Sequence, residues 1–130
     1  MPYINIRIGC KLNAEQKNKI NKKATQLMNQ VMGKNPEVTV VHIMESEQDN
    51  WSVNSLTLSK DNPIGAYVDI KITEGTNTSE EKSKMIEETV LMLESTVGAI
   101  QEACYVVIHD ISANSWGYNG KTQQARALKV

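Results

Sequence analysis

Apolar and polar residues alternate at the start of the chain, over residues 2–8. Isoleucine occupies every second position there, at Ile4, Ile6 and Ile8, which is the two-residue period of a strand with one buried face. When the second half of the chain is laid on the first at an offset of 64, residues 66–72 fall on residues 2–8 and match them almost throughout. The pattern predicts two equivalent strands and a duplicated unit.

A helical period follows each of these strands. Apolar residues recur every three or four positions through residues 20–31 and again through residues 86–97, as on the buried side of an amphipathic helix. Polar capping residues and glycines mark the expected ends of these helices. They are Asn13 and Gly33 for the first helix, and Thr78 and Gly98 for the second.

Each helix leads into a run of β-branched and aromatic residues, at 38–43 and at 105–109. The chain therefore reads as β-α-β twice, and the connector over residues 46–62 has room for a short hairpin. A β-α-β unit needs parallel strands and a right-handed crossover. Two such units predict an α+β fold, with a four-stranded sheet and two helices on one face. We expect one domain over residues 1–130, built of pseudo-repeats 2–62 and 63–130.

The second face of this sheet has no cover within the chain. Apolar residues on both faces of the strand around residues 106–108 would then meet water. Assembly with copies of the same chain removes that surface from water, so the pattern predicts an oligomer.

Composition narrows the classes of partner. The net charge of −1 gives no electrostatic footprint for nucleic acid or for an acidic membrane, and no run of residues is apolar enough for a membrane span. Cys10 and Cys104 lie far apart without metal-ligand spacing. We expect a soluble cytoplasmic protein with free thiols, no metal and no cofactor.

Pro2 carries the most unusual chemistry in the chain. If Met1 is removed, Pro2 begins the chain with a free secondary amine, whereas the nitrogen of an internal proline is a tertiary amide. Such an amine is a candidate general base or nucleophile. The structural alternative is that proline is simply tolerated at the first residue of a strand.

Four stretches of the chain, in this order, resemble the tautomerase superfamily: the strand after Pro2, residues 33–43, the strand ending at Ile72, and residues 105–119. The closer likeness is to macrophage migration inhibitory factor and phenylpyruvate tautomerases, and the more distant one to 4-oxalocrotonate tautomerase and malonate semialdehyde decarboxylase. It extends over essentially the whole chain.

The resemblance implies a homotrimer with sites at the subunit boundaries. It also implies a cofactor-free keto-enol tautomerase, an isomerase that acts on a small α-keto monocarboxylate such as phenylpyruvate. In the family the N-terminal proline moves the proton. The residues that match the family's site are Pro2 as base, Lys34 for the substrate carboxylate, Ile72 for the apolar wall, and Tyr105 from a neighbouring subunit. Trp116 is close enough to Tyr105 in sequence to line the same pocket.

Departures from the family pattern restrict the substrate. Val107 stands where the family has an asparagine, which puts a hydroxyphenyl substrate in doubt. Ala66 stands where the duplication would place a second proline, so one active proline per chain is expected. The only arginines are Arg7 and Arg126. The arginine pairs of the superfamily's decarboxylases and dehalogenases are therefore absent. So is the arginine that 4-oxalocrotonate tautomerase has near Lys11, and a dicarboxylate fits less well.

Plainer interpretations of the same residues remain open. Lys34 also suits the C-terminal dipole of a helix, Tyr105 suits any strand, and Ile72 suits a core. His42 and His109 are expected to be packing or hydrogen-bonded residues. The rival functions are a hydratase, dehalogenase or decarboxylase that uses the same proline, and a non-catalytic, cytokine-like interaction protein.

Overall fold

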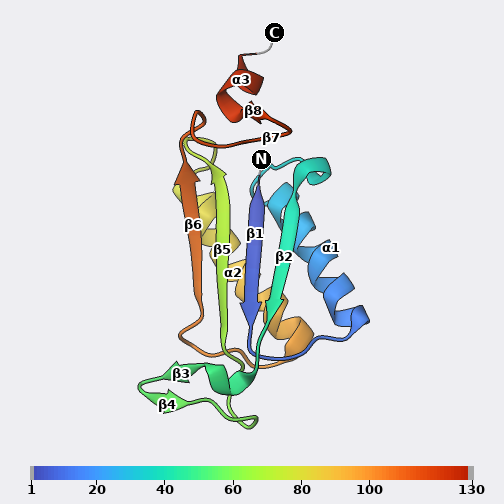
Figure 1. Cartoon of the computed structure of the whole chain (residues 1–130), viewed down its shortest axis with the longest axis vertical. Coiled ribbons are helices and arrows are strands. Elements are labelled where there is room, and N and C mark those ends of the chain that lie inside the picture. Colours follow the sequence, from blue (N-terminus) through green and yellow to red (C-terminus); the bar gives the residue numbers. More distant parts are fainter. Residues whose placement is uncertain (1, 129–130) are drawn as a thin grey trace.

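The computed structural model describes residues 2–128. Its main elements follow the predicted order of strand, helix and strand, twice over. Short hairpins and a final short helix lie after the second and fourth long strands (Figure 1). The strands are β1 (Tyr3–Ile8), β2 (Val40–Glu45), β3 (Ser52–Val53), β4 (Leu56–Thr57), β5 (Ala66–Thr73), β6 (Tyr105–Ile111), β7 (Gly117–Tyr118) and β8 (Lys121–Thr122). The helices are α1 (Ala14–Gln30), α2 (Ser79–Val97) and α3 (Gln123–Ala127), with 3-10 turns at Pro36–Val38 and Gln48–Asn50.

The four long strands form one sheet in the order β2-β1-β5-β6. β1 runs parallel to β2, β5 runs parallel to β6, and the two units join through the antiparallel pair of β1 and β5. In that pair Ile8 lies opposite Ala66 and Tyr3 lies opposite Lys71. The start of β1 therefore lies beside the end of β5, and the start of β5 lies beside the end of β1. The predicted α+β fold is confirmed.

Both long helices cover the same face of the sheet (Figure 1). The isoleucines of β1 are fully buried beneath them, as the two-residue alternation predicts. The core consists almost entirely of aliphatic and sulfur-containing side chains, contributed by β1, α1, β5 and α2. Its fully buried members include Ile4, Ile6, Ile8, Ile20, Met28, Val68, Ile70, Ile72, Met85 and Leu93.

The helix ends follow the predicted caps. Asn13 with Gln16, and Thr78 with Glu81, each form a reciprocal capping box. Gly33, at a positive φ of 69°, ends α1. Its N–H donates to the carbonyl of Asn29, and the N–H of Lys34 donates to that of Met28. The first is a 5→1 bond, as in an αL cap, and the second bond holds the backbone of the residue after the glycine.

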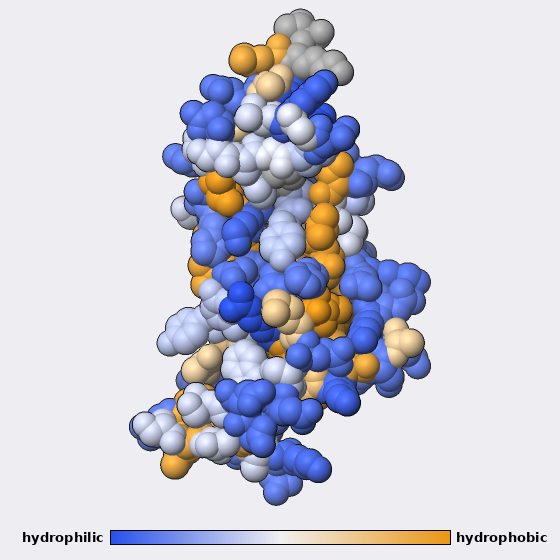
Figure 2. Space-filling model, in the orientation of Figure 1, coloured by the Kyte–Doolittle hydropathy of each residue, from blue (hydrophilic) through white to orange (hydrophobic). Residues whose placement is uncertain are grey.

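The uncovered face of the sheet is more polar than the sequence analysis expected. Figure 2 shows polar residues over most of this face, with an apolar strip along β2. Val106 and Ile108 pack on the helix side with the core, so of that run Val107 belongs to the uncovered side. Asp69, in the middle of this face, accepts a hydrogen bond from the Tyr67 hydroxyl at 2.8 Å and pairs with His109 Nε2 at 2.8 Å. The apolar surface is concentrated on the edge strand β2, where Val40 is 53% exposed.

The two ends of the sheet carry different additions (Figure 1). The hairpin of β3 and β4, predicted within residues 46–62, lies where β5 begins. The hairpin of β7 and β8 and the helix α3 lie at the opposite end, where β1 begins, and nothing in the sequence analysis predicted them. No helix among residues 2–128 is long and apolar enough to cross a membrane.

Candidate active site

Pro2 lies at the end of the sheet that carries α3. Its side chain is fully buried, and its carbonyl accepts a hydrogen bond from the Val40 N–H at 3.2 Å. Because Tyr3 lies opposite Lys71 in the antiparallel pair, the same register places Pro2 opposite Ile72. Pro2, the residue before β1, is thus bonded to the start of β2 and lies across from the end of β5.

Lys34 is a buried lysine at the same end of the sheet. It is 8% exposed, and its Nζ donates a hydrogen bond to Thr76 Oγ1 at 2.7 Å. Burial lowers the pKa of the Lys34 ammonium, and the nearby carboxylates of Glu81 and Asp110 offset this only in part. The side chain therefore holds a positive charge in a partly dehydrated position, where it attracts an anion more strongly than a solvated lysine does.

The C-terminal segment adds Trp116 to this end of the sheet. Its indole Nε1 donates a hydrogen bond to Thr73 Oγ1 at 3.1 Å, at the last residue of β5. Its carbonyl accepts from the Gln123 N–H, which ties α3 to the same turn. Trp116 is half-buried, so part of the indole is left to form a wall.

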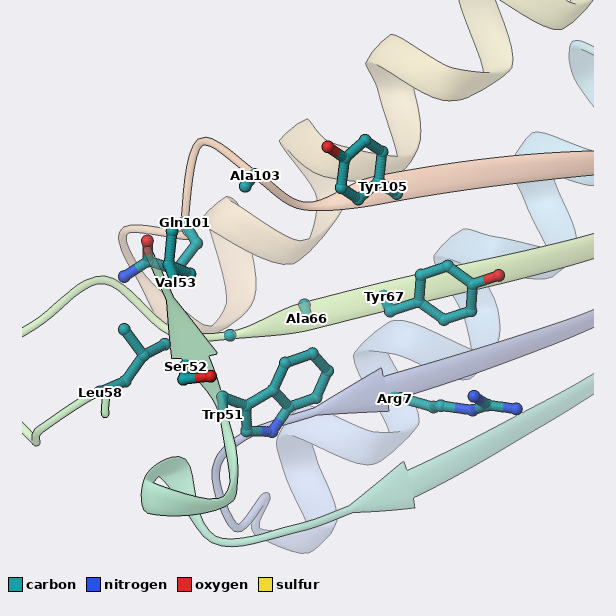
Figure 3. Close-up of a pocket in the computed structure, with 11 residues that line it drawn as sticks. Arg7, Trp51, Ser52, Val53, Leu58, Ala66, Tyr67, Gln101, Ala103 and Tyr105 are labelled. Carbon is teal, nitrogen blue, oxygen red and sulfur yellow. The ribbon is translucent and has the colours of Figure 1, made fainter. Parts of the chain in front are cut away.

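Ile72 lies across from Pro2 but within the core, and Tyr105 lies at the other end of the sheet. Ile72 is fully buried in the core beneath the helices. Tyr105 begins β6 at the opposite end of the sheet and is 69% exposed. Figure 3 shows its ring over β6, on the other side of β5 from Trp51. One chain thus brings together Pro2, Lys34 and Trp116 around the end of β5, and leaves Tyr105 apart from them.

Arg126 is a residue that the sequence analysis set aside. It lies in α3, with its guanidinium carbon 3.8 Å from the centre of the Tyr118 ring and with Nη2 donating to the Tyr118 carbonyl at 2.9 Å. Its Nε is buried without a hydrogen-bond partner among residues 2–128. The short α3 gave no helical period long enough to place this arginine from the sequence.

If Met1 is removed, the chemistry available at this end is that of an amine, an ammonium and an indole. In the part of the chain that the structure describes, no group of three His, Cys, Asp or Glu side chains is placed to hold a metal ion. A neutral amine at Pro2 could accept a proton, and Lys34 could hold a carboxylate.

Comparisons with known proteins agree on a family. The sequence profile described as "Tautomerase enzyme" matches residues 2–60 and again residues 67–126. Probable tautomerase K2 from Dickeya dadantii (strain 3937) is 43% identical over 61 residues, which is 46% of this chain and 91% of that protein. The two matches of the profile correspond to the two β-α-β units.

Solved structures share the fold at lower identity. Native fused 4-OT is 18% identical with a TM-score of 0.82, covering 96% of this chain and 98% of that one. A fused 4-OT described as a symmetric trimer gives a TM-score of 0.84 at 19% identity, covering 95% and 98% of the two chains. A macrophage migration inhibitory factor-like protein from Entamoeba histolytica gives 0.76 at 19% identity, covering 93% and 97%.

Proposed function

The chain belongs to the tautomerase enzyme family, and we propose that it uses the amine of Pro2, after removal of Met1, as the general base of a keto-enol tautomerase. The proposed substrate is a small α-keto monocarboxylate such as phenylpyruvate. The observation that carries the proposal is the placement of buried Pro2 at the end of the sheet that also holds Lys34 and Trp116.

The reaction needs one group that accepts and returns a proton. The neutral Pro2 nitrogen takes a proton from the carbon next to the carbonyl, which leaves an enolate, and the resulting ammonium returns a proton to the enolate oxygen. Burial of Pro2 disfavours its charged form, which keeps the amine available as a base. Covalent bonds other than those to the transferred proton stay intact, so the step requires no cofactor.

Lys34 is the proposed partner of the substrate carboxylate. Its hydrogen bond to Thr76 fixes the ammonium in place, so little side-chain entropy is lost when an anion binds. A single lysine acts as a point charge and does not form the bidentate fork of an arginine, which suits one carboxylate. Trp116 would form a wall of the pocket, and Ile72 would support its apolar floor from the core.

The complete site needs a neighbouring subunit in this proposal. Tyr105 lies at the far end of its own sheet, so it can reach a Pro2 amine only in another copy of the chain. We propose a homotrimer because a fused 4-OT of the same fold is a trimer. The apolar edge of β2, with Val40 and Met44 exposed, also favours pairing with another chain.

The state of the two cysteines is relevant to the cellular compartment of the protein. Cys10 and Cys104 are both free, and partial burial raises the pKa of each thiol, with Glu45 and Glu94 adding to the effect. Both are therefore poor nucleophiles and resist oxidation. Free, unreactive thiols fit a cytoplasmic location, which we include in the proposal.

The decisive experiment measures the keto-enol interconversion of phenylpyruvate by protein whose intact mass shows that Met1 is absent. Replacing Pro2 by glycine leaves an N-terminal primary amine with different basicity and geometry, so we expect at least a hundredfold loss of kcat/KM with the oligomer intact. Pro63→Gly is the matched control, because Pro63 is internal and exposed and its activity should equal that of the wild type. Undiminished turnover in Pro2→Gly would reject the proline base.

A further inference from the structure

A cavity of about 480 Å³ lies at the end of the sheet away from Pro2, where β5 begins. Ala66 forms part of its floor, and the rings of Trp51, Tyr67 and Tyr105 stand around it (Figure 3). Val53 of the β3–β4 hairpin and Leu58 lie on the side away from the middle of the sheet. The volume is in the range of pockets that hold small organic ligands.

The cavity occupies the position that the duplication makes equivalent to the Pro2 site. Ala66 opens β5 as Pro2 opens β1, and Trp51 follows β2 as Trp116 follows β6. The nitrogen of Ala66 is an internal amide and cannot act as a base at any ordinary pH. The second unit thus repeats the scaffold of the site without the group that would do the chemistry.

The indole of Trp51 is a rigid wall of this cavity. Its Nε1 donates a hydrogen bond to Ser46 Oγ at 2.9 Å. A Cβ on Gly65 would lie 2.7 Å from Trp51 Cδ2, and one on Gly9 would lie 2.9 Å from Trp51 Nε1. The ring is therefore held between two glycine backbones, in a place that exists only because neither residue has a side chain. A fixed aromatic face loses little entropy when a ligand stacks on it.

Arg7 supplies a cation at the side of the cavity nearer the middle of the sheet, and Figure 3 shows its side chain extending away from Trp51. It lies opposite Tyr67 in the sheet register, with its guanidinium carbon 5.4 Å from the centre of the Tyr67 ring. Its Nε donates to Asn5 Oδ1 at 3.1 Å, and within residues 2–128 no other hydrogen bond is recorded from the guanidinium. Asp69 is 3.9 Å from Nη2, too far for a hydrogen bond.

Asp69 forms an ion pair with Arg7 but no hydrogen bond. Its Oδ2 lies 3.9 Å from Arg7 Nη2, whereas its Oδ1 pairs with Tyr67 and His109, each at 2.8 Å. Among residues 2–128 the two Nη groups of Arg7 therefore have no hydrogen-bond acceptor, and they present a planar set of donors that matches the two oxygens of a carboxylate.

From these contacts we propose that the cavity at Ala66 binds a small monocarboxylate with an aromatic body and does not convert it. The carboxylate meets the Arg7 guanidinium, and the aromatic ring lies against Trp51 over Ala66. Tyr105 forms only an outer wall, and the proposal does not depend on whether it also reaches a neighbouring subunit. The chain would then hold two different acid sites, one with a base and one without.

The test uses 3-phenylpropanoate, an aromatic monocarboxylate that has no keto group. Trp116→Phe leaves Trp51 as the only tryptophan, so its fluorescence reports on this cavity alone. We expect a saturable change in emission, and at least tenfold weaker binding in Arg7→Gln. The neutral analogue 3-phenylpropanol should bind at least tenfold more weakly than the acid. Equal binding of acid and alcohol would overturn the role of Arg7.

A matched pair of hairpin variants keeps the test independent of Arg7. Val53 and Leu56 face each other across β3 and β4 and are 38% and 68% exposed, and only Val53 lines the cavity. Val53→Glu should abolish binding by placing a negative charge at the wall, and Leu56→Glu should leave it unchanged. Binding that survives Val53→Glu would overturn the proposal. So would a Val53→Glu chain that falls apart into monomers, because the cavity would then be an interface between copies.

The proposed ligand site at Ala66 can be disproved without disproving the proposed Pro2 site. Binding of 3-phenylpropanoate to Trp51 should persist in Pro2→Gly, where the proposed tautomerase activity is lost. Loss of both in that variant would show that Trp51 reports on the Pro2 site and would overturn the second site. The expected pattern is loss of the fluorescence change when Arg7→Gln is added to Trp116→Phe, and full phenylpyruvate turnover when Arg7→Gln is made alone in the wild-type chain.

Discussion

Lys34 and Thr76 are bound to each other at the end of the sheet that carries Pro2, with 2.7 Å between Lys34 Nζ and Thr76 Oγ1. The threonine hydroxyl in turn donates to the Thr73 carbonyl at 2.6 Å. This chain of two hydrogen bonds links the residue after the first helix to the end of β5. The proposed carboxylate site is therefore built by both units of the duplication.

Thr76→Val should destabilise the protein in a pH-dependent way. The variant leaves a buried ammonium with one acceptor fewer, at a cost of about 2 kcal/mol in the free energy of unfolding near neutral pH. The folded pKa of Lys34 is below its unfolded value, so the folded state loses the charge first as pH rises. The cost should shrink as pH rises through the folded pKa of Lys34, which lies below the ordinary lysine value, as followed by urea denaturation. Thr39→Val, which removes only a bond to the Asn35 carbonyl, should show a constant cost.

Lys34→Met should raise KM for phenylpyruvate with little change in kcat. Methionine keeps most of the buried volume and removes only the charge, which the proposal assigns to ground state and transition state alike. Loss of a buried ion pair with the substrate should raise KM at least tenfold, about 1.4 kcal/mol in binding free energy. Steady-state kinetics with and without the substitution measure this. A fall in kcat at constant KM would assign Lys34 to the chemical step instead.

Asp69→Asn should lower the free energy of unfolding at neutral pH and should make it depend less on pH in acid. Burial raises the pKa of the Asp69 carboxyl, but the hydrogen bonds from His109 and Tyr67 outweigh it, and the net pKa lies below the ordinary value. The stabilisation is thus complete above the unfolded pKa of about 4 and is lost as pH falls through the lower folded pKa. We expect a loss of about 1.5 kcal/mol at neutral pH, absent in strong acid. Asp61→Asn, at an exposed position, should have no effect.

Gly65→Ala should displace Trp51 and destabilise the chain by about 1 to 3 kcal/mol, as overpacking does. The new Cβ would lie 2.7 Å from the indole, and the ring cannot move away without losing its bond to Ser46. In the Trp116→Phe background, the emission maximum of Trp51 should shift. Gly120→Ala is the comparison, since Gly120 has a positive φ of 78° with open space around it. It should cost backbone strain and leave the Trp51 emission unchanged.

The main strands and helices could be predicted from the sequence because the local residue patterns there agree with the tertiary packing. Ile4, Ile6 and Ile8 alternate as the buried face of β1 requires, and the caps at Asn13 and Thr78 lie where the helices begin. The short hairpin β7–β8 and α3 escaped prediction because two-residue strands and a five-residue helix have no period to detect. Their position depends on long-range contacts such as that of Trp116 with Thr73.

The candidate site was only partly predictable. Resemblance to the family pointed to Pro2 and Lys34, which lie at one end of the sheet, but no pattern in the sequence shows that Lys34 is buried or that Thr76 holds it. His109 is hydrogen-bonded, as the sequence analysis allowed, but its partner Asp69 was missed. The members of this polar network come from different strands, and each looks like an ordinary exposed strand residue until the strands pair. Arg7 is the clearest case, since Tyr67 and Asp69 beside it both come from β5.

Joining β1 to β5 in one chain has an evolutionary consequence. Probable tautomerase K2 is about one unit long, since a 61-residue match covers 91% of it. In an assembly of such short chains, every substitution changes every site at once. In a chain with two units, a change near Ala66 leaves Pro2 untouched. Natural selection can therefore reshape one end of the sheet for a new ligand while the other end keeps its chemistry.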